Sequence, residues 1–443
     1  MTRGGIRLLA AAVGMAALPA FAATYTVTTT ADSGAGSLRQ AIQDANGHSG
    51  ADVIAFAIPG AGVHTIVPLS ELPAVTDGVT IDGYTQPGSR PNARADADDA
   101  VILVDLAGTA APAGAQGLVI AHDGCTVRGL AVHGFHPVNG STGGDGLVVT
   151  GSQCVIAGNF IGTDPSGLVA DGNTEGVSIV GNGNRIGGLS TADRNLIAAG
   201  VNAVGLRFSG DGGVIEGNFI GVDATGYGNV GSRGAGIFIG GNDDTIGGTN
   251  PAAANVIAFN GGAVIVPDKE SAGIAIIRNS IFGNGVNPRG VGGIDLGYDG
   301  VTADDACDGD TGANGLQNSP LLISAVSQDG AVDVDFTLES APSELYRVEF
   351  FASPACDSSG HGQGRDFIGA VNISSDAGCG VSATAHLPVC LEGEFVITAT
   401  ATNSAKDTSE FSACVPLAVA PGTFCRVILP APPALPKKVR GRS

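Results

Sequence analysis

Charged residues in the middle of the chain are the first candidates for chemistry. Three arginines and three carboxylates lie in or beside short apolar runs: Arg128, Arg207, Arg278, Asp164, Glu216 and Asp223. A polysaccharide lyase would need a basic residue to remove the proton alpha to a uronate carboxylate. A glycoside hydrolase would need two carboxylates that flank the scissile bond. Nothing in the spacing places two of these residues at the same height, so solvated outward positions on a sheet are the alternative interpretation.

A second group of carboxylates suggests a cation site. Aspartates crowd one glycine-containing segment, at Asp304, Asp305, Asp308 and Asp310. Calcium prefers several oxygen ligands in a flexible loop, so this segment is the predicted calcium site, with a soluble hinge as the alternative. Asp164, Asp171 and Asp223 lie in two long loops that should share one edge, which is a weaker candidate for an ion. His133 and His136 form an H-x-x-H pair, which without further ligands favours an incidental arrangement.

The segments that would position these residues have a repeated sequence. NFIGTD begins at Asn159, and NFIGVD begins at Asn218. Asparagine followed by one residue and then isoleucine recurs at intervals of 36, 23, 37 and 24, at Asn159, Asn195, Asn218, Asn255 and Asn279. A long turn therefore alternates with a short one. Repeats of roughly 20 to 50 residues are typical of stacked units that bury a core only against their neighbours.

Each repeat contains short apolar runs bounded by glycine, such as GLVVTG, GVSIVG and GIFIGG. An α-helix needs a longer periodic stretch, so these runs predict strands. About three runs per turn predict a parallel β-helix, in which each strand pairs with its counterpart one turn away. The repeated asparagines would stack at one bend, since Asn tolerates left-handed geometry there and its amide can bond the next turn.

Further segments complete the predicted organisation. GSLRQAIQDANG, residues 36–47, has a capping-box pattern at Ser37 and Gln40 and one apolar face, which predicts a helix over the first turn. The coil is expected over residues 23–300 and an acidic linker over 301–318. Alternating runs such as VDVDFTL and YRVEFFA then predict an antiparallel β-sandwich over 319–418. The proline-rich residues 419–443 are expected to be disordered.

The first residues predict export. Arg3 and Arg7 flank or precede an apolar stretch, and AFA at 20–22 offers small residues for cleavage, so residues 1–22 are interpreted as a signal peptide. The stretch is too short for a membrane span and no second one follows, so the mature protein is expected to be secreted or held at a cell surface. Export makes disulfides plausible. The expected pairs are Cys356 with Cys414 and Cys379 with Cys390, whereas Cys125 and Cys154 occupy matching repeat positions and could stack or bond.

Composition and charge narrow the class of partner. The chain has 71 glycines and 43% hydrophobic residues, which is too apolar for a disordered protein. Its net charge of −21 argues against nucleic acid, because binding there depends on Lys and Arg that neutralise phosphates. The same charge makes an anionic polysaccharide an awkward partner unless a divalent cation mediates.

The GNFIGTD…IGG…NLIA units and GSLRQAIQDAN resemble exported bacterial proteins of the pectin-lyase-like right-handed β-helix superfamily. More narrowly, they resemble the subgroup whose N-terminal cap carries a CSLREA motif, although Gly36 replaces the Cys and Gln40 the Glu. The likeness covers most of residues 24–300, and TSEFSACV looks like part of the sandwich that often follows. The superfamily includes pectate lyases, polygalacturonases, phage tailspikes and adhesin-like proteins, so the resemblance implies a right-handed coil and an association with carbohydrate.

The polygalacturonase motifs of that superfamily are poorly matched. GTD with Asp164 approximates NTD, while Asp243 and Asp244 match a DD motif but are better explained by turn chemistry. GHG occurs only at residues 360–362, in the predicted sandwich. The sequence therefore predicts an all-β, exported, non-catalytic polysaccharide-binding or adhesin-like scaffold. The alternative is a carbohydrate-active lyase or hydrolase, which would be favoured if the arginines and carboxylates gathered in one cleft of the coil.

Overall fold

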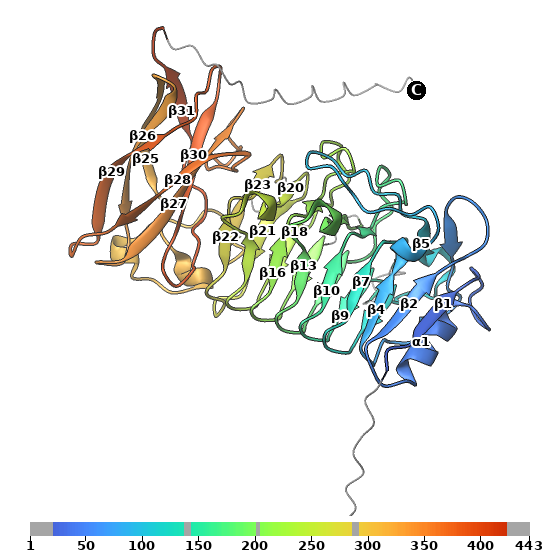
Figure 1. Ribbon diagram of the computed structural model, residues 1–443. Helices are drawn as coiled ribbons and strands as arrows, with labels where there is room; N and C mark the ends of the chain where they lie inside the picture. The colour runs from blue at the N-terminus through green and yellow to red at the C-terminus, as the bar shows by residue number, and fades with distance from the viewer. Residues whose placement is uncertain (1–20, 137–142, 201–203, 286–291, 423–443) are drawn as a thin grey trace, which may run out of the picture.

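The structure is a computed structural model that describes residues 21–136, 143–200, 204–285 and 292–422. Most of the predicted signal peptide (residues 1–20) and most of the predicted disordered tail (423–443) lie outside these ranges. The described chain forms a long coil of parallel strands followed by a smaller, largely antiparallel unit (Figure 1). The predicted all-β fold with a parallel β-helix is confirmed.

The described strands of the coil form three parallel sheets, which we call A, B and C. Sheet A contains β1 (Thr24–Val27), β2 (Asp52–Phe56), β4 (Val79–Asp82), β7 (Thr126–Arg128), β10 (Val155–Ala157), β13 (Arg185–Gly187), β16 (Val214–Glu216), β19 (Thr245–Gly247) and β22 (Ala275–Ile277). Sheet B contains β3 (His64–Ile66), β5 (Val104–Ala107), β8 (Leu130–His133), β11 (Phe160–Ile161), β14 (Leu196–Ile197), β17 (Phe219–Ile220), β20 (Val256–Ala258) and β23 (Ser280–Phe282). Sheet C contains β6 (Leu118–Ile120), β9 (Leu147–Val149), β12 (Val177–Ile179), β15 (Leu206–Phe208), β18 (Ala235–Ile239), β21 (Gly262–Val266) and β24 (Ile294–Leu296).

The core of the coil is built from columns of identical or similar apolar residues. In sheet A the inward position is filled on successive turns, in register, by Ile54, Ile81, Val127, Ile156, Ile186, Ile215, Ile246 and Ile276. These side chains are 0–3% exposed. β-branched residues pack well on a pleated strand, so repeating one residue type at one height gives a continuous core from very short strands.

The predicted asparagine ladder is present at the bend between sheets A and B. Each of its first four members donates from Nδ2 to Oδ1 of the next at 2.9–3.1 Å, in the order Asn159, Asn195, Asn218, Asn255 and Asn279. The side chains are 0–2% exposed. Because a buried amide costs free energy unless it is hydrogen-bonded, the ladder fixes the register of successive turns. Gly158 and Gly217, which precede two of these asparagines, have φ of +68° and +71°, where glycine is favoured.

The N-terminal end of the coil is covered by a helix, as predicted. Helix α1 (Leu38–Asn46) begins after Ser37, whose hydroxyl accepts from the Gln40 N–H, and it buries Leu38 and Ile42 against the first strands. Short 3₁₀ turns lie at bends: η1 (Gly83–Thr85), η2 (Gly108–Ala110), η3 (Thr191–Asp193) and η4 (Pro251–Ala253). None of the described helices is long and apolar enough to cross a membrane.

A smaller β-unit follows the coil. The connecting segment contains η5 (Ala306–Asp308) and η6 (Ala313–Leu316). The strands of the unit, which we call the sandwich, are β25 (Leu321–Gln328), β26 (Ala331–Glu339), β27 (Leu345–Ser353), β28 (Asp366–Ser374), β29 (Gly380–Leu387), β30 (Val396–Thr402) and β31 (Val415–Val419). All pairings among these strands are antiparallel except that of β25 with β31. The sandwich has its own buried core, which includes Phe336, Tyr346 and Phe350.

The disulfides correct one prediction. Cys356 bonds Cys414, as predicted. The predicted bond between Cys379 and Cys390 is wrong, because Cys379 bonds Cys307 in the connecting segment. Cys390 is also disulfide-bonded. The prediction failed because it paired cysteines by proximity in sequence, whereas the connecting segment folds back against the β26–β29 end of the sandwich. Cys125 and Cys154 are register partners in the coil, buried and unbonded.

Candidate functional site

The three arginines proposed for catalysis lie on different parts of the coil. Arg128 ends β7 in sheet A, where its guanidinium lies 5.3 Å from the Tyr84 ring centroid and 3.5 Å from Asp82 Oδ1. Arg207 lies in β15 of sheet C. Arg278 follows β22 at the far end of sheet A, and its guanidinium lies 4.1 Å from the ring centroid of Phe367 in the sandwich. The structure does not bring these arginines together.

The three carboxylates are not brought together either. Glu216 ends β16 in sheet A and forms an ion pair with Arg185. Asp164 and Asp223 lie in the two long loops after β11 and β17, beside sheet B, and each accepts a hydroxyl hydrogen bond within its own loop. The sequence is right that these two loops share one edge. The carboxylates nevertheless face partners of their own and do not surround a common space with the arginines.

One candidate, Arg207, belongs to a different arrangement on the outer face of sheet C. Its guanidinium lies 4.6 Å from the ring centroid of Phe238 on the next turn, and its Nε donates to Glu175 Oε1 at 2.6 Å. Phe238 in turn contacts Tyr298 edge to face, with centroids 6.1 Å apart. We call Arg207, Phe238 and Tyr298 the sheet C platform. Sequence reasoning missed Phe238 and Glu175, although aligning LRF of β15 with IFI of β18 would place Arg207 beside Phe238.

Two carboxylates lie at the edge of this platform. Asp145 and Glu175 precede β9 and β12, and Asp145 Oδ1 accepts from the Glu175 N–H at 3.2 Å. Burial, together with the negative charge of Glu175, raises the pKa of Asp145 to about 6. Glu175 is paired with Arg207, whose Nε lies 2.6 Å from Glu175 Oε1. Neighbouring carboxylates in unequal environments are the arrangement that acid–base catalysis uses.

On sheet B, His133 bridges two carboxylates. Its Nδ1 lies 2.7 Å from Asp171 Oδ2 in the long loop, and its Nε2 lies 2.8 Å from Asp105 Oδ1 in β5. Burial opposes the imidazolium, but the two carboxylates outweigh it and raise the pKa of His133 above its usual value. His136 is more distant, at 3.8 Å from Asp171. The arrangement ties the long loop to sheet B through His133.

A groove lies next to this bridge. Its volume is about 570 Å³, and its walls include Thr65, Asp105, Ile102, Asp164 and Ser166. Thr65 donates to Asp105 Oδ2 at 2.8 Å, so the carboxylate in the groove already has two partners. The groove is thus mixed in polarity, and its polar groups are satisfied from within the protein.

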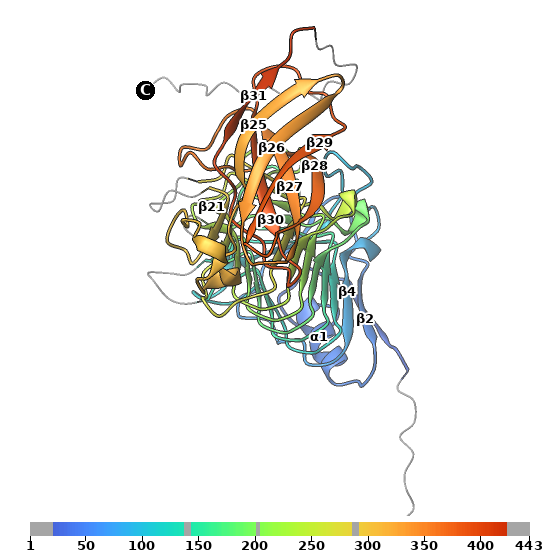
Figure 2. The same cartoon turned by 90° about the vertical axis from the view of Figure 1, so that its left-hand side faces the viewer.

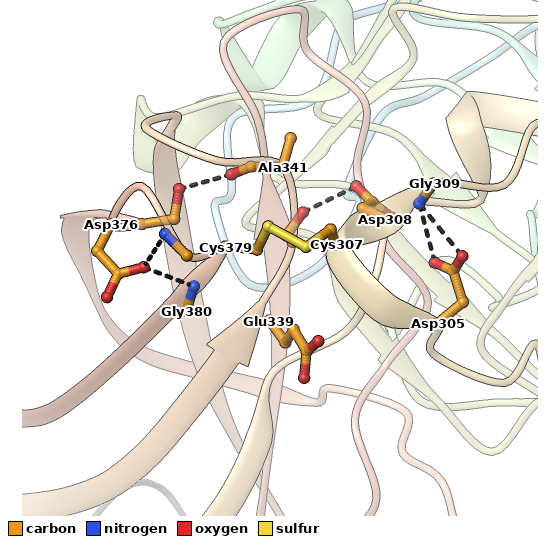
Figure 3. Close-up of a disulfide and its surroundings, with 12 residues drawn as sticks. Asp305, Cys307, Asp308, Gly309, Glu339, Ala341, Asp376, Cys379 and Gly380 are labelled. Atoms are coloured by element: carbon orange, nitrogen blue, oxygen red, sulfur yellow. Dashed lines mark hydrogen bonds between the residues drawn. A yellow bond between two sulfur atoms is a disulfide. The ribbon is translucent and has the colours of Figure 1, made fainter.

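The predicted cation site is partly assembled. Asp305, Asp308 and Asp310 offer oxygens that lie within 4.8 Å of one another and could hold a metal ion. Asp304 does not join them and accepts from the Ser319 N–H at 2.8 Å. Figure 3 shows Asp305 and Asp308 on the side of Cys307 away from its disulfide to Cys379, which anchors this turn to the sandwich. Burial raises the pKa of Asp308 and of Asp310.

Comparisons with known proteins are sparse. No protein-family model matches the chain, and no curated protein matches it. Among solved structures, the Dettilon tailspike protein (gp208) aligns with 13% sequence identity and a TM-score of 0.27, over 87% of this chain and 92% of the tailspike chain. The parallel β-helix is therefore an observation made on this chain, and membership of the pectin-lyase-like superfamily and its CSLREA subgroup stays a prediction from the sequence motifs.

Proposed function

We propose that the protein is an exported scaffold that binds a polysaccharide on its coil without cleaving it. The dispersal of the six candidate catalytic residues over different sheets and turns carries this proposal. A long flat coil with paired charges and an aromatic pair on one face is suited to contact several sugar units along a polymer. The sheet C platform is the proposed contact surface, because the faces of sugar rings pack on aromatic rings and their hydroxyls accept from guanidinium groups.

The charge of the surface favours an uncharged or amino-sugar polymer over a polyuronate. Three arginines of the coil's outer faces already have carboxylate partners: Arg128 lies near Asp82, Arg185 pairs with Glu216, and Arg207 pairs with Glu175. An anionic polymer would have to compete with these carboxylates within a chain whose net charge is −21.

The test is a panel of neutral, amino-sugar and uronate polysaccharides, with binding to the purified mature protein measured by affinity electrophoresis and products by reducing-end assay. Phe238→Ala should weaken binding at least about tenfold, whereas Tyr227→Ala, in an exposed loop on another side of the coil, should not. Product release from any glycan would contradict the non-catalytic proposal. Equal binding by both variants would move the site away from the platform.

A hydrolytic role is the second candidate, and the Asp145–Glu175 pair is the observation that favours it. Glycosidases use one carboxylic acid to protonate the leaving oxygen and a second, ionised carboxylate on the other side of the bond. In that case Asp145→Asn and Glu175→Gln would each abolish any product formed by the parent protein. If the parent releases product and both variants retain it, this pair is not the catalytic one.

Export and calcium binding are proposed on separate grounds. The disulfides fit an oxidising compartment, which supports the interpretation of residues 1–22 as a signal peptide. N-terminal sequencing of the exported protein should then begin at Ala23. For calcium, the oxygens of Asp305, Asp308 and Asp310 are the hard ligands that this ion prefers. Calorimetric titration should show binding that Asp308→Asn weakens and that Asp329→Asn, an exposed turn carboxylate, leaves unchanged. Absence of heat with the parent protein would reject the site.

A further inference from the structure

The last described turn of the coil ends in backbone groups that no further strand of the coil satisfies. On a parallel strand, alternate N–H groups point to opposite neighbours. In and around β22 the outward-pointing groups are those of Ile274, Ile276 and Arg278, since the N–H of Ala275 bonds back to Asp244. An open edge of this kind is a template for pairing with another chain, and natural proteins cover it.

The sandwich and connecting segment supply an acceptor for each of these groups. The Ile274 N–H donates to Asn314 Oδ1 at 2.9 Å, the Ile276 N–H to Thr408 Oγ1 at 2.9 Å, and the Arg278 N–H to Glu349 Oε2 at 2.7 Å. The preceding Gly273 N–H donates to Asp407 Oδ1 at 2.6 Å. These acceptors take the place that the carbonyl groups of a further sheet A strand would occupy.

The other two sheets end in the same way. In sheet B the Ile281 N–H donates to the Gly364 carbonyl at 2.8 Å, and the Asn284 N–H donates to Gln363 Oε1 at 2.9 Å. In sheet C the Leu296 N–H donates to Glu410 Oε1 at 2.8 Å. Gln363 also accepts from Asn284 Nδ2 at 3.2 Å, as one asparagine accepts from another in the ladder. All three described sheets are therefore closed by one set of residues, which we call the plug.

Apolar contacts accompany the polar ones. Phe351 and Phe411 of the sandwich belong to the same buried cluster as the core of the coil and contact each other with centroids 5.5 Å apart. Figure 2, seen from the sandwich end, shows β27 and β30 in front of the coil. The end of the coil is thus covered both by hydrogen bonds to its three sheets and by apolar contact with its core.

Five of the seven plug residues come from two stretches of the sandwich that one disulfide joins, whereas Asn314 lies in the connecting segment and Glu349 in β27. Gln363 and Gly364 lie in the loop after Cys356, while Asp407, Thr408 and Glu410 lie before Cys414. The Cys414 N–H donates to the Gly360 carbonyl, and the Gly362 N–H donates to the Ser412 carbonyl. The bond forms by exchange with an oxidant that carries a disulfide, which is reduced to a dithiol while the two thiols are oxidised. In a reducing cytosol these stretches would not be joined.

We propose that the Cys356–Cys414 disulfide forms once the protein reaches an oxidising compartment, completes the plug there, and from then on keeps the end of the coil from pairing with a second copy of this chain. The partner at an unplugged end would be the same end of another copy, because α1 covers the opposite end (Figure 1). Two identical open edges can pair about a two-fold axis, and such an interface closes on itself. An unplugged chain should therefore form dimers and not filaments.

Hydrogen exchange on the full chain tests the plug. In Cys356→Ser/Cys414→Ser, peptides that cover 273–284 and 294–297 should exchange at least about tenfold faster than in the oxidised parent. Cys307→Ser/Cys379→Ser is the matched control, since that disulfide does not join the stretches that carry Gln363, Gly364, Asp407, Thr408 and Glu410, and it should leave the peptides that cover 276–284 and 294–297 protected. Residues 273–275 are left out of this control, because Asn314, which accepts from the Ile274 N–H, lies in the segment that Cys307–Cys379 anchors. Peptides that cover 155–161, in the middle of the coil, should be unchanged in both variants. Protection of the coil end in Cys356→Ser/Cys414→Ser would overturn the role of this disulfide.

Light scattering on the same samples tests the partner. Relative to the oxidised parent, Cys356→Ser/Cys414→Ser should double in mass and stop there. An exposed end without a change in mass would overturn pairing with a second copy, and larger polymers would overturn the two-fold geometry. If the double cysteine variant exchanges freely throughout, Asp407→Ala in the oxidised chain replaces it. That variant removes the acceptor of the Gly273 N–H and, within the sandwich, the acceptor of Asn403 Nδ2. Within the coil, faster exchange confined to the end of sheet A is expected, and unchanged protection there would contradict the plug.

Discussion

Replacing Asp244 by asparagine should stabilise this protein, and the gain should grow with pH. Asp244 precedes β19 and is fully buried. Its Oδ1 accepts from the Gly213 N–H on the preceding turn at 2.6 Å. Its Oδ2 has no hydrogen-bond partner among the described residues and lies beside Gly241, where the Gly210 carbonyl oxygen is also close. Burial raises the pKa of Asp244 to about 7, so ionisation near neutral pH leaves a carboxylate oxygen facing a carbonyl oxygen.

An asparagine elsewhere in the coil shows what this position accommodates. Asn184 lies two turns before Asp244, in the same column of sheet A. Its Oδ1 accepts from the Cys154 N–H at 2.7 Å, as the aspartate does from Gly213. Its Nδ2 donates to the carbonyls of Gly181 and Gly151 at 2.7 and 3.0 Å, which are the equivalents of the groups near Asp244 Oδ2. Asparagine at position 244 can therefore make the donor contacts that only a protonated aspartate could make.

The magnitude follows from the raised pKa. The folded pKa of Asp244 is about 7 against an unfolded value of 3.8, so its neutral form is favoured in the folded state. The associated stability is fully present below pH 3.8 and is lost as the pH rises through about 7. At about 1.4 kcal/mol per pKa unit, the parent loses up to about 4 kcal/mol across this window. The variant does not titrate, so its advantage should rise from about 1–2 kcal/mol at pH 5 to about 4 kcal/mol at pH 8.

The assay is denaturant unfolding of the parent and Asp244→Asn at pH 5, 6, 7 and 8, followed by circular dichroism. Asp243→Asn is the matched control, because it makes the same change of charge at the adjacent, exposed residue and should shift stability by less than about 0.5 kcal/mol at every pH. An advantage for Asp244→Asn that is independent of pH would refute the argument from ionisation. A loss of stability at pH 8 would refute the argument that the amide finds carbonyl partners.

Two further predictions concern polar groups that hold turns together. Asn218→Ala should lower the free energy of unfolding by about 3 kcal/mol, since it leaves the Ile186 carbonyl and the Asn195 N–H of the preceding turn without this partner and removes the side-chain bonds to Asn195 and Asn255. Exposed Asn242→Ala should cost less than about 0.5 kcal/mol. His133→Gln should cost on the order of 2 kcal/mol at pH 5.5, because a charge-assisted bridge between Asp105 and Asp171 is lost. The pKa of His133 is raised, so its contribution is present below pH 6.5 and disappears as the pH rises above the folded pKa. The cost of His133→Gln should therefore shrink at high pH, and a constant cost would contradict the charged bridge.

The asparagine ladder could be predicted because its chemistry is periodic in the sequence. The amide at each bend bonds an equivalent amide on the next turn, so the regular recurrence of asparagines such as Asn159 and Asn218 predicts the ladder. Helix α1 was predictable for a local reason, since Ser37 and the apolar face of the helix act within a few residues. Both features depend on contacts between residues at regular or short separations in the sequence.

The contacts between unequal turns could not be predicted in the same way. Arg207 meets Glu175 from one turn and Phe238 from the next, and those residues lie at different positions within their repeats. Aligning the apolar runs LRF and IFI would find the contact with Phe238. The contact with Glu175 depends on how many residues each loop contains, which composition and periodicity do not reveal. The bond of Cys307 to Cys379 is a stronger case, because its position follows from how the connecting segment folds against the sandwich.

The hydrogen-bond pattern of the coil continues beyond the last recognisable repeat in the sequence. The stacked positions that include Asn184 and Asp244 show this. On alternate turns, an acceptor side chain receives a backbone N–H from the turn before: Asn184 from Cys154, Asp244 from Gly213, and Asn314 from Ile274. Asn314 lies in the predicted acidic linker, beyond the last recognisable repeat, yet its Nδ2 also donates back to the Ile274 carbonyl at 2.9 Å and to the Thr408 carbonyl at 3.0 Å. An amide suits this position because the edge of the final turn presents both an N–H and a carbonyl at Ile274, which need an acceptor and a donor from the same side chain. A search for repeats does not find such a residue, because Asn314 lies outside the repeated sequence. Its role follows from the unpaired groups of the final turn that it contacts.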